Sequence, residues 1–207
     1  MALCQHLTHY LDFGGTKVFW VFLILFCKLT CKRRICCESG NDVLAKAILD
    51  STPPNLRSKL LKQGDEADDK RNCFFKACQR KKVNLVKFLH SQNSDLVRSV
   101  SNQGMTVLHV ASVMGYTEMV KLLLGMGLSV NSRDSENFQP LHIACQAGHT
   151  EVAELLLKAG ADIHDARNED GTAPIHFASE SNKPELLELL IKHGVDVNQQ
   201  ETDGCTA

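Results

Sequence analysis

The feature that most constrains the fold of this chain is an internal repeat. Three segments fall into one register, beginning at Gly104, Asn137 and Gly171. They read GMTVLHVASVMGYTEMVKLLLGMGLSVN, NFQPLHIACQAGHTEVAELLLKAGADIH and GTAPIHFASESNKPELLELLIKHGVDVN. A unit of this size cannot bury its own apolar faces, whereas stacked copies share a continuous core. The repeat therefore predicts an elongated stack of similar units.

Each unit is predicted to hold two short helices. In the second copy the first helix covers 140–147, and Gly148 ends it. The second helix covers 150–158 and carries a wide apolar stripe. Gly160 follows, at a position where a helix commonly ends in a left-handed conformation.

Two columns of the alignment keep one residue type in all three copies. One column holds histidine and the other glycine, and each glycine follows its histidine at the same distance in every copy. The members of the two columns are His109, His142 and His176, and Gly127, Gly160 and Gly194.

These units resemble the ankyrin repeat family, whose repeat opens with T-P-L-H-x-A. The matching stretches are 106–111, 139–144 and 173–178. The resemblance implies an all-α solenoid of stacked helix–turn–helix units joined by short β-hairpin loops. It covers about residues 70–207 well and 35–207 more loosely.

The histidine column could be mistaken for a metal site. Stacked helices lie roughly 8–10 Å apart, whereas two nitrogens on one zinc lie about 3–3.5 Å apart. The column therefore cannot share a metal, and the resemblance implies that each histidine hydrogen-bonds backbone and ties one unit to the next. Cys145 aligns with Ser112 and Ser179, which favours packing over nucleophilic catalysis.

No other motif indicates chemistry. Phosphate-binding loops, zinc-protease motifs and nucleophile elbows are absent from the sequence. We therefore expect no enzyme activity, no catalytic residue, no metal and no cofactor within these 207 residues.

The repeat register divides the chain. It predicts an N-terminal segment of apolar and basic character, a degenerate repeat-like helix with a linker, a degenerate ankyrin repeat, three regular repeats and the start of a further repeat. Because the helices of that last unit are missing, we expect a solenoid truncated at its C-terminus. The segments are, in the same order, 1–34, 35–69, 70–100, 101–133, 134–166, 167–200 and 201–207.

The N-terminal segment contains ten uninterrupted apolar residues, Val18 to Cys27, followed by basic residues. Spanning a bilayer takes roughly 20 residues. Membrane contact through residues 17–37 is one interpretation. A secretory signal, a helix lying on the stack and sequence translated from a wrong start site are the others.

The distribution of charge limits which kinds of partner the sequence predicts, and the spacing of the cysteines limits the cellular compartment. Residues 57–98 hold 11 Lys/Arg and 5 Asp/Glu, whereas residues 99–207 hold 6 and 15. The acidic half would repel a polynucleotide, so we expect no nucleic-acid partner. The nine cysteines fit neither a zinc ribbon nor a disulfide framework. We expect a cytoplasmic monomer, with a membrane face as the alternative location.

The predicted function is that of a scaffold or adaptor that binds a polypeptide partner along the concave groove of the stack. A membrane-tethered regulator and the ankyrin region of a longer enzyme or channel remain alternatives. By resemblance, the contacts come from hairpin tips and the exposed side of each first helix. The first half of this surface is unusually apolar, which is typical of an interface; the alternative is that the degenerate first repeat or the N-terminal apolar segment covers these side chains. The mapped residues are Gln103, Met105, Val113, Met114, Met126, Arg133, Glu136, Phe138, Gln146, Ala147, Asp170, Thr172, Glu180, Ser181 and His193.

Overall fold

The computed structural model describes residues 50, 72–165 and 170–207. The predicted N-terminal segment 1–34, the membrane-contact segment 17–37 and nearly all of 35–69 lie outside the described residues. The described part is built from four helix pairs and one 3-10 helix. The elements are α6 (Cys73–Gln79), α7 (Val83–Gln92), η3 (Ser94–Arg98), α8 (Val107–Val113), α9 (Thr117–Gly125), α10 (Pro140–Gln146), α11 (Thr150–Lys158), α12 (Pro174–Glu180) and α13 (Pro184–Lys192).

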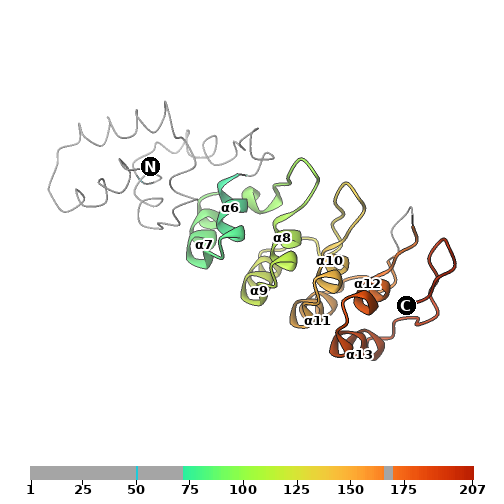
Figure 1. Ribbon diagram of the computed structural model, residues 1–207. Coiled ribbons are helices and arrows are strands. Elements are labelled where there is room, and N and C mark those ends of the chain that lie inside the picture. The colour runs from blue at the N-terminus through green and yellow to red at the C-terminus, as the bar shows by residue number, and fades with distance from the viewer. Residues whose placement is uncertain (1–49, 51–71, 166–169) are drawn as a thin grey trace, which may run out of the picture.

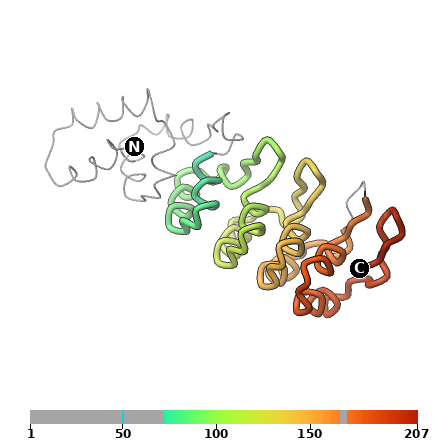
Figure 2. Tube along the Cα trace, viewed as in Figure 1, coloured from blue at the N-terminus to red at the C-terminus, as the bar shows by residue number. Residues whose placement is uncertain are grey.

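The four pairs are stacked side by side in chain order (Figure 1). The first helices form one row, in which α6 packs on α8, α8 on α10 and α10 on α12. The second helices form a parallel row beneath them, and the connecting loops project together to the other side, as the chain path in Figure 2 shows. Within the described ranges the strand pairing consists of one isolated bridge, Val100 to Thr106. The predicted all-α repeat solenoid is confirmed.

A column of left-handed residues reverses the chain inside each pair. Lys81, Gly115, Gly148 and Asn182 stand between the first and second helices, with φ of 55°, 65°, 68° and 54°. Glycine adopts this conformation at little cost, and asparagine tolerates it better than most residues. Lys81 takes the same turn in the degenerate repeat, so the backbone path holds even where the glycine is missing.

The core lies between the two rows of helices. In α10 and α11 it contains Leu141, Val152 and Leu156, each at most 1% exposed. The equivalent residues of the other pairs are buried in the same way, and one cluster runs through all four pairs. Successive repeats therefore share apolar contacts instead of each closing its own core.

Candidate protein-binding face

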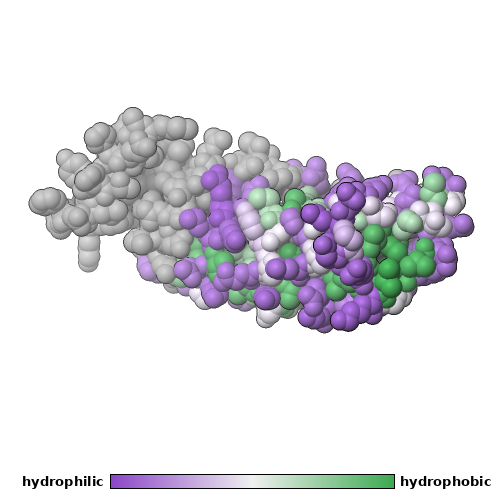
Figure 3. Space-filling model, turned by 60° about the horizontal axis from the view of Figure 1, so that its bottom comes forward, coloured by the Kyte–Doolittle hydropathy of each residue, from purple (hydrophilic) through white to green (hydrophobic). Residues whose placement is uncertain are grey.

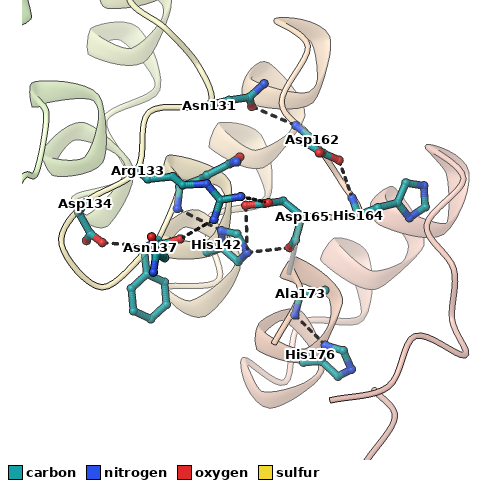
Figure 4. Close-up of polar contacts among 12 residues, drawn as sticks. Asn131, Arg133, Asp134, Asn137, His142, Asp162, His164, Asp165, Ala173 and His176 are labelled. Atoms are coloured by element: carbon teal, nitrogen blue, oxygen red, sulfur yellow. Dashed lines mark hydrogen bonds and ion pairs between the residues drawn. The ribbon is translucent and has the colours of Figure 1, made fainter. Parts of the chain in front are cut away.

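The three column histidines are buried, and each ties the start of its first helix to a backbone carbonyl that follows its own helix pair. The Nδ1 atom of His142 accepts a hydrogen bond from the backbone N–H of Gln139 at 3.1 Å, and its Nε2 lies 2.9 Å from the carbonyl oxygen of Asp165 (Figure 4). Because an N–H can only donate and a carbonyl can only accept, the ring is the neutral tautomer that carries its proton on Nε2. One side chain thus caps the first turn of α10 and holds the following hairpin.

His109 and His176 repeat this arrangement. His109 accepts from the N–H of Thr106 at 3.0 Å and donates to the carbonyl of Phe138 at 3.0 Å. His176 accepts from the N–H of Ala173 and donates to the carbonyl of Gln199. Burial lowers the pKa of His109 from its usual value, although the nearby Phe138 carbonyl and Asp134 carboxylate oppose that shift.

The degenerate repeat replaces its histidine with a different device. Phe75 occupies the histidine position and is buried. Three residues earlier, the Oδ1 of Asn72 accepts from the N–H of Phe75 at 3.0 Å, and its Nδ2 donates to the hydroxyl of Ser99 at 2.6 Å. Asn72 therefore caps the first helix and reaches the following hairpin, as a histidine does elsewhere.

The hairpin tips are tied to one another along the stack. The N–H of Ser135 donates to the carbonyl of Gln103 at 2.9 Å, and the N–H of Thr202 donates to that of Asp170 at 3.0 Å. A Cβ on Gly104 would lie 3.1 Å from the nitrogen of Ser135, so this close approach favours glycine. The tips form an ordered edge with exposed side chains at Gln103, Glu136, Asp170 and Asp203, named the tip row below.

A second exposed line follows the C-terminal ends of the first helices. The C-cap residues of α6, α8, α10 and α12 are Arg80, Met114, Ala147 and Ser181, named the C-cap row below. Because the first helices pack in order, these four positions succeed one another along the stack. At its apolar centre Val113 and Met114 are each 43% exposed.

One of the contacts between repeats is an ion pair. The guanidinium of Arg133 pairs with Oδ1 of Asp165, whose side chain is only 8% exposed (Figure 4). Burial raises the pKa of Asp165, while Arg133 acts in the opposite direction. The second carboxylate oxygen lies 4.0 Å from Nε2 of His142. Arg133 therefore fastens its own hairpin to the end of the next repeat.

Beside this pair lies an aromatic cluster. The rings of Phe138 and Phe177 are 5.5 Å apart, and the ring of His142 lies 6.1 Å from Phe138 and 6.0 Å from Phe177. Both contacts with His142 are edge-to-face, which suits the charge distribution of aromatic rings. Phe138 therefore belongs to the packing between two repeats.

The structure separates the predicted contact residues into three groups by their exposure. Most are exposed, whereas Met105, Met126, Phe138 and Ser181 are half-buried. Met126 and Phe138 pack against the core. Thr172, predicted as a contact residue, is buried because it lies at the base of a hairpin. It offers almost no surface to a partner. The exposed ones are Gln103, Val113, Met114, Arg133, Glu136, Gln146, Ala147, Asp170, Glu180 and His193.

Sequence reasoning missed part of this face. Arg80 and Lys81 are exposed at the first position of the C-cap row and the turn after it, yet neither was among the predicted contact residues. The signal was available, since aligning Ala77 with Ala111 places Arg80 beside Met114. The ion pair of Arg133 was missed as well, because it joins residues 32 positions apart.

Among the residues the structure describes, no group of three His, Cys, Asp or Glu side chains is placed to hold a metal ion. Burial raises the pKa of Cys145 to about 12, so its thiol is protonated near neutral pH and a poor nucleophile. None of the helices in the described ranges is long and apolar enough to cross a membrane.

Comparison with known proteins agrees with this architecture. A family model described as ankyrin repeats, in three copies, matches residues 34–134 and 127–201. No curated protein matches the chain significantly. Since the matched ranges cover most of the 207 residues, the chain belongs to the ankyrin repeat family.

Proposed function

We propose that this chain is a protein-interaction scaffold that binds a polypeptide along the face between the tip row and the C-cap row. Ankyrin repeats generally mediate protein–protein interactions. The face offers what such binding needs: a rigid backbone, exposed side chains from several repeats, and apolar surface among polar groups.

The observation that carries this proposal is the exposure of Val113 and Met114. They are adjacent apolar residues at the end of α8, and both are among the large hydrophobic side chains the structure leaves exposed. Methionine adapts its shape to a partner, and burying such side chains supplies the main favourable term in association. The neighbouring Gln146 and Ala147 extend the surface without charge.

The lower face of the stack presents a different surface. Figure 3 shows mainly hydrophilic residues there, with hydrophobic residues gathered toward the C-terminal end. Ile191 on α13, at that end of the chain, is 54% exposed. It provides a matched control, because it is an exposed apolar residue that belongs to neither row.

The test is a selection of displayed random peptides on the full chain, followed by binding measurements on purified variants. The double variant Val113→Ser with Met114→Ser should lose the enriched peptides, whereas Ile191→Ser should keep them. Both variants should unfold near the wild-type temperature. If no enriched peptide depends on Val113 and Met114, the proposed function is wrong.

A further inference from the structure

The charges along the two rows are not evenly distributed. At the start of the C-cap row Arg80 is exposed, and Lys81 follows it with its Nζ 5.2 Å from the centre of the Tyr116 ring. At the end of the row Glu180 precedes Ser181. Together with these neighbouring residues, the surface along the C-cap row therefore runs from basic through apolar to acidic as the chain proceeds.

The tip row strengthens the acidic end. Its first member, Gln103, is neutral, and the next three are Glu136, Asp170 and Asp203. Lys183 is the exception at this end; its side chain lies over Gly148. Carboxylates still outnumber it, with Glu180 beside the C-cap row and Glu136, Asp170 and Asp203 in the tip row.

We propose that the partner segment has the opposite charge order: acidic residues at the end that lies over Arg80 and Lys81, an apolar centre over Val113 and Met114, and basic residues at the end that lies over Glu180 and Asp170. This inference rests on the proposed function and adds the chemistry and the direction of the partner. Like charges placed opposite each other disfavour the reversed orientation, so the gradient selects one direction of binding.

The length of the segment follows from the spacing of the repeats. Three repeat steps separate Arg80 from Ser181, and packed helices are roughly 8–10 Å apart, which gives roughly 24–30 Å. An extended chain covers that distance with roughly eight residues. A peptide of this length can therefore touch both charged ends at once.

The peptides selected on the full chain supply the first test. Those that require Val113 and Met114 should carry acidic residues on one side of an apolar centre and basic residues on the other. If patch-dependent peptides are enriched but their charges show no such order, this inference is overturned while the proposed function stands. If none is enriched, the proposed function fails and this inference fails with it.

A charge-exchange experiment then fixes the direction. Arg80→Glu with Lys81→Glu should weaken the best selected peptide by about three- to tenfold in a fluorescence anisotropy titration, and more at low salt. Changing the acidic end of the peptide to lysine should restore binding to that variant and weaken binding to the wild type. The control Lys121→Glu reverses an exposed charge on α9, away from both rows, and should change affinity little.

Two outcomes would contradict the proposal. One is a free-energy loss with Lys121→Glu of half that of the double variant or more, which would mean that net charge alone matters, since the control reverses one charge and the double variant reverses two. The other is restoration by lysine at the opposite end of the peptide, which would mean that the segment lies in the other direction. Thermal unfolding of each variant checks that the fold is kept.

Discussion

The Nε2 of His142 donates to the carbonyl oxygen of Asp165 at 2.9 Å, so the side chain that caps α10 also holds the end of its own repeat in place. The two groups are 23 residues apart in the chain. The same pattern recurs at His176, whose partner Gln199 lies in its own repeat, whereas His109 donates to Phe138 of the next repeat and so also links two repeats.

Replacing His142 with alanine should strongly destabilise the stack. The change leaves the buried N–H of Gln139 and the carbonyl of Asp165 without their partner, and each unsatisfied group costs about 1–3 kcal/mol. Urea unfolding should show a loss of about 2–4 kcal/mol. His164→Ala is the matched control, because that side chain is exposed and should contribute little. Equal losses in the two variants would contradict the structural role.

Stability should fall as the pH drops below the normal pKa of histidine, in part because of His109. Burial lowers its pKa in the folded state, so the unfolded chain binds the proton more readily. The contribution is fully present above pH ~6.5 and declines as the pH falls from there toward the folded-state pKa. Urea unfolding between pH 7.5 and 5.5 measures this slope. His109→Gln should flatten it, and an unchanged slope would assign it to other groups.

Gly115→Ala should cost more stability than Gly127→Ala. Both glycines have positive φ, of 65° and 80°, so alanine is strained at either position by about 1–2 kcal/mol. At Gly115 the added Cβ would also lie 2.7 Å from the ring of His149, which hydrogen-bonds the carbonyl of Val113 at 3.1 Å. At Gly127 the space is open.

The displaced ring explains that difference, and a double variant tests the explanation. Combining Gly115→Ala with His149→Ala should remove the extra cost, because the ring is no longer there to be displaced. Thermal unfolding of Gly115→Ala, of His149→Ala and of the double variant gives the comparison. If the extra cost persists without the ring, the contact with His149 is not its source.

Serine substitutions at Phe138 and Met114 should distinguish a residue that packs between repeats from one that lies on the surface. Phe138 packs against Phe177 and His142 between two repeats, so Phe138→Ser should cost about 2–4 kcal/mol. Met114 is exposed at a helix end, so Met114→Ser should stay within about 0.5 kcal/mol of the wild type. Thermal unfolding measures both. A large loss for Met114→Ser would make that residue part of the core.

Much of the fold could be predicted because the same helix–turn–helix sequence pattern occurs in several copies. The helix predicted over 150–158 is α11 without change, and the helix break predicted at Gly148 is observed. The ends of a helix depend on the residues around them, and an alignment of the repeats shows which of these residues recur. The hydrogen bonds of the histidines join backbone groups whose positions the repeat itself sets.

The parts that were not predictable depend on differences between the copies. Phe138 stands in a column mapped as a contact surface, yet Phe177 in the next repeat gives it a ring to pack against. Arg133 was mapped as a contact, yet Asp165 lies within reach of it. Asn72 makes the equivalent hydrogen bonds in a repeat that has a phenylalanine at the histidine position. Each of these contacts depends on one specific neighbouring residue. A pattern common to all copies does not show a residue pair that occurs in only one of them.

The pair of Arg133 with Asp165 gives the last prediction. Arg133→Ala leaves a buried carboxylate without its partner, which should raise the pKa of Asp165 further above its usual range. A group whose pKa is raised by folding binds its proton more tightly when folded, so stability falls as the pH rises through that range. Arg133→Ala should therefore lose more stability at pH 7, by about 1–2 kcal/mol, than at pH 4.

Adding Asp165→Asn should abolish this pH dependence, since no charge is then left without a partner. Urea unfolding of the wild type and of the single and double variants at both pH values measures the effect. In the single variant Asp165→Asn, Arg133 remains and is partly exposed, so water can solvate its guanidinium. The double variant should be more stable than Arg133→Ala at pH 7, because it removes the unpaired carboxylate, and the reverse order would show that this carboxylate is not the source of the cost.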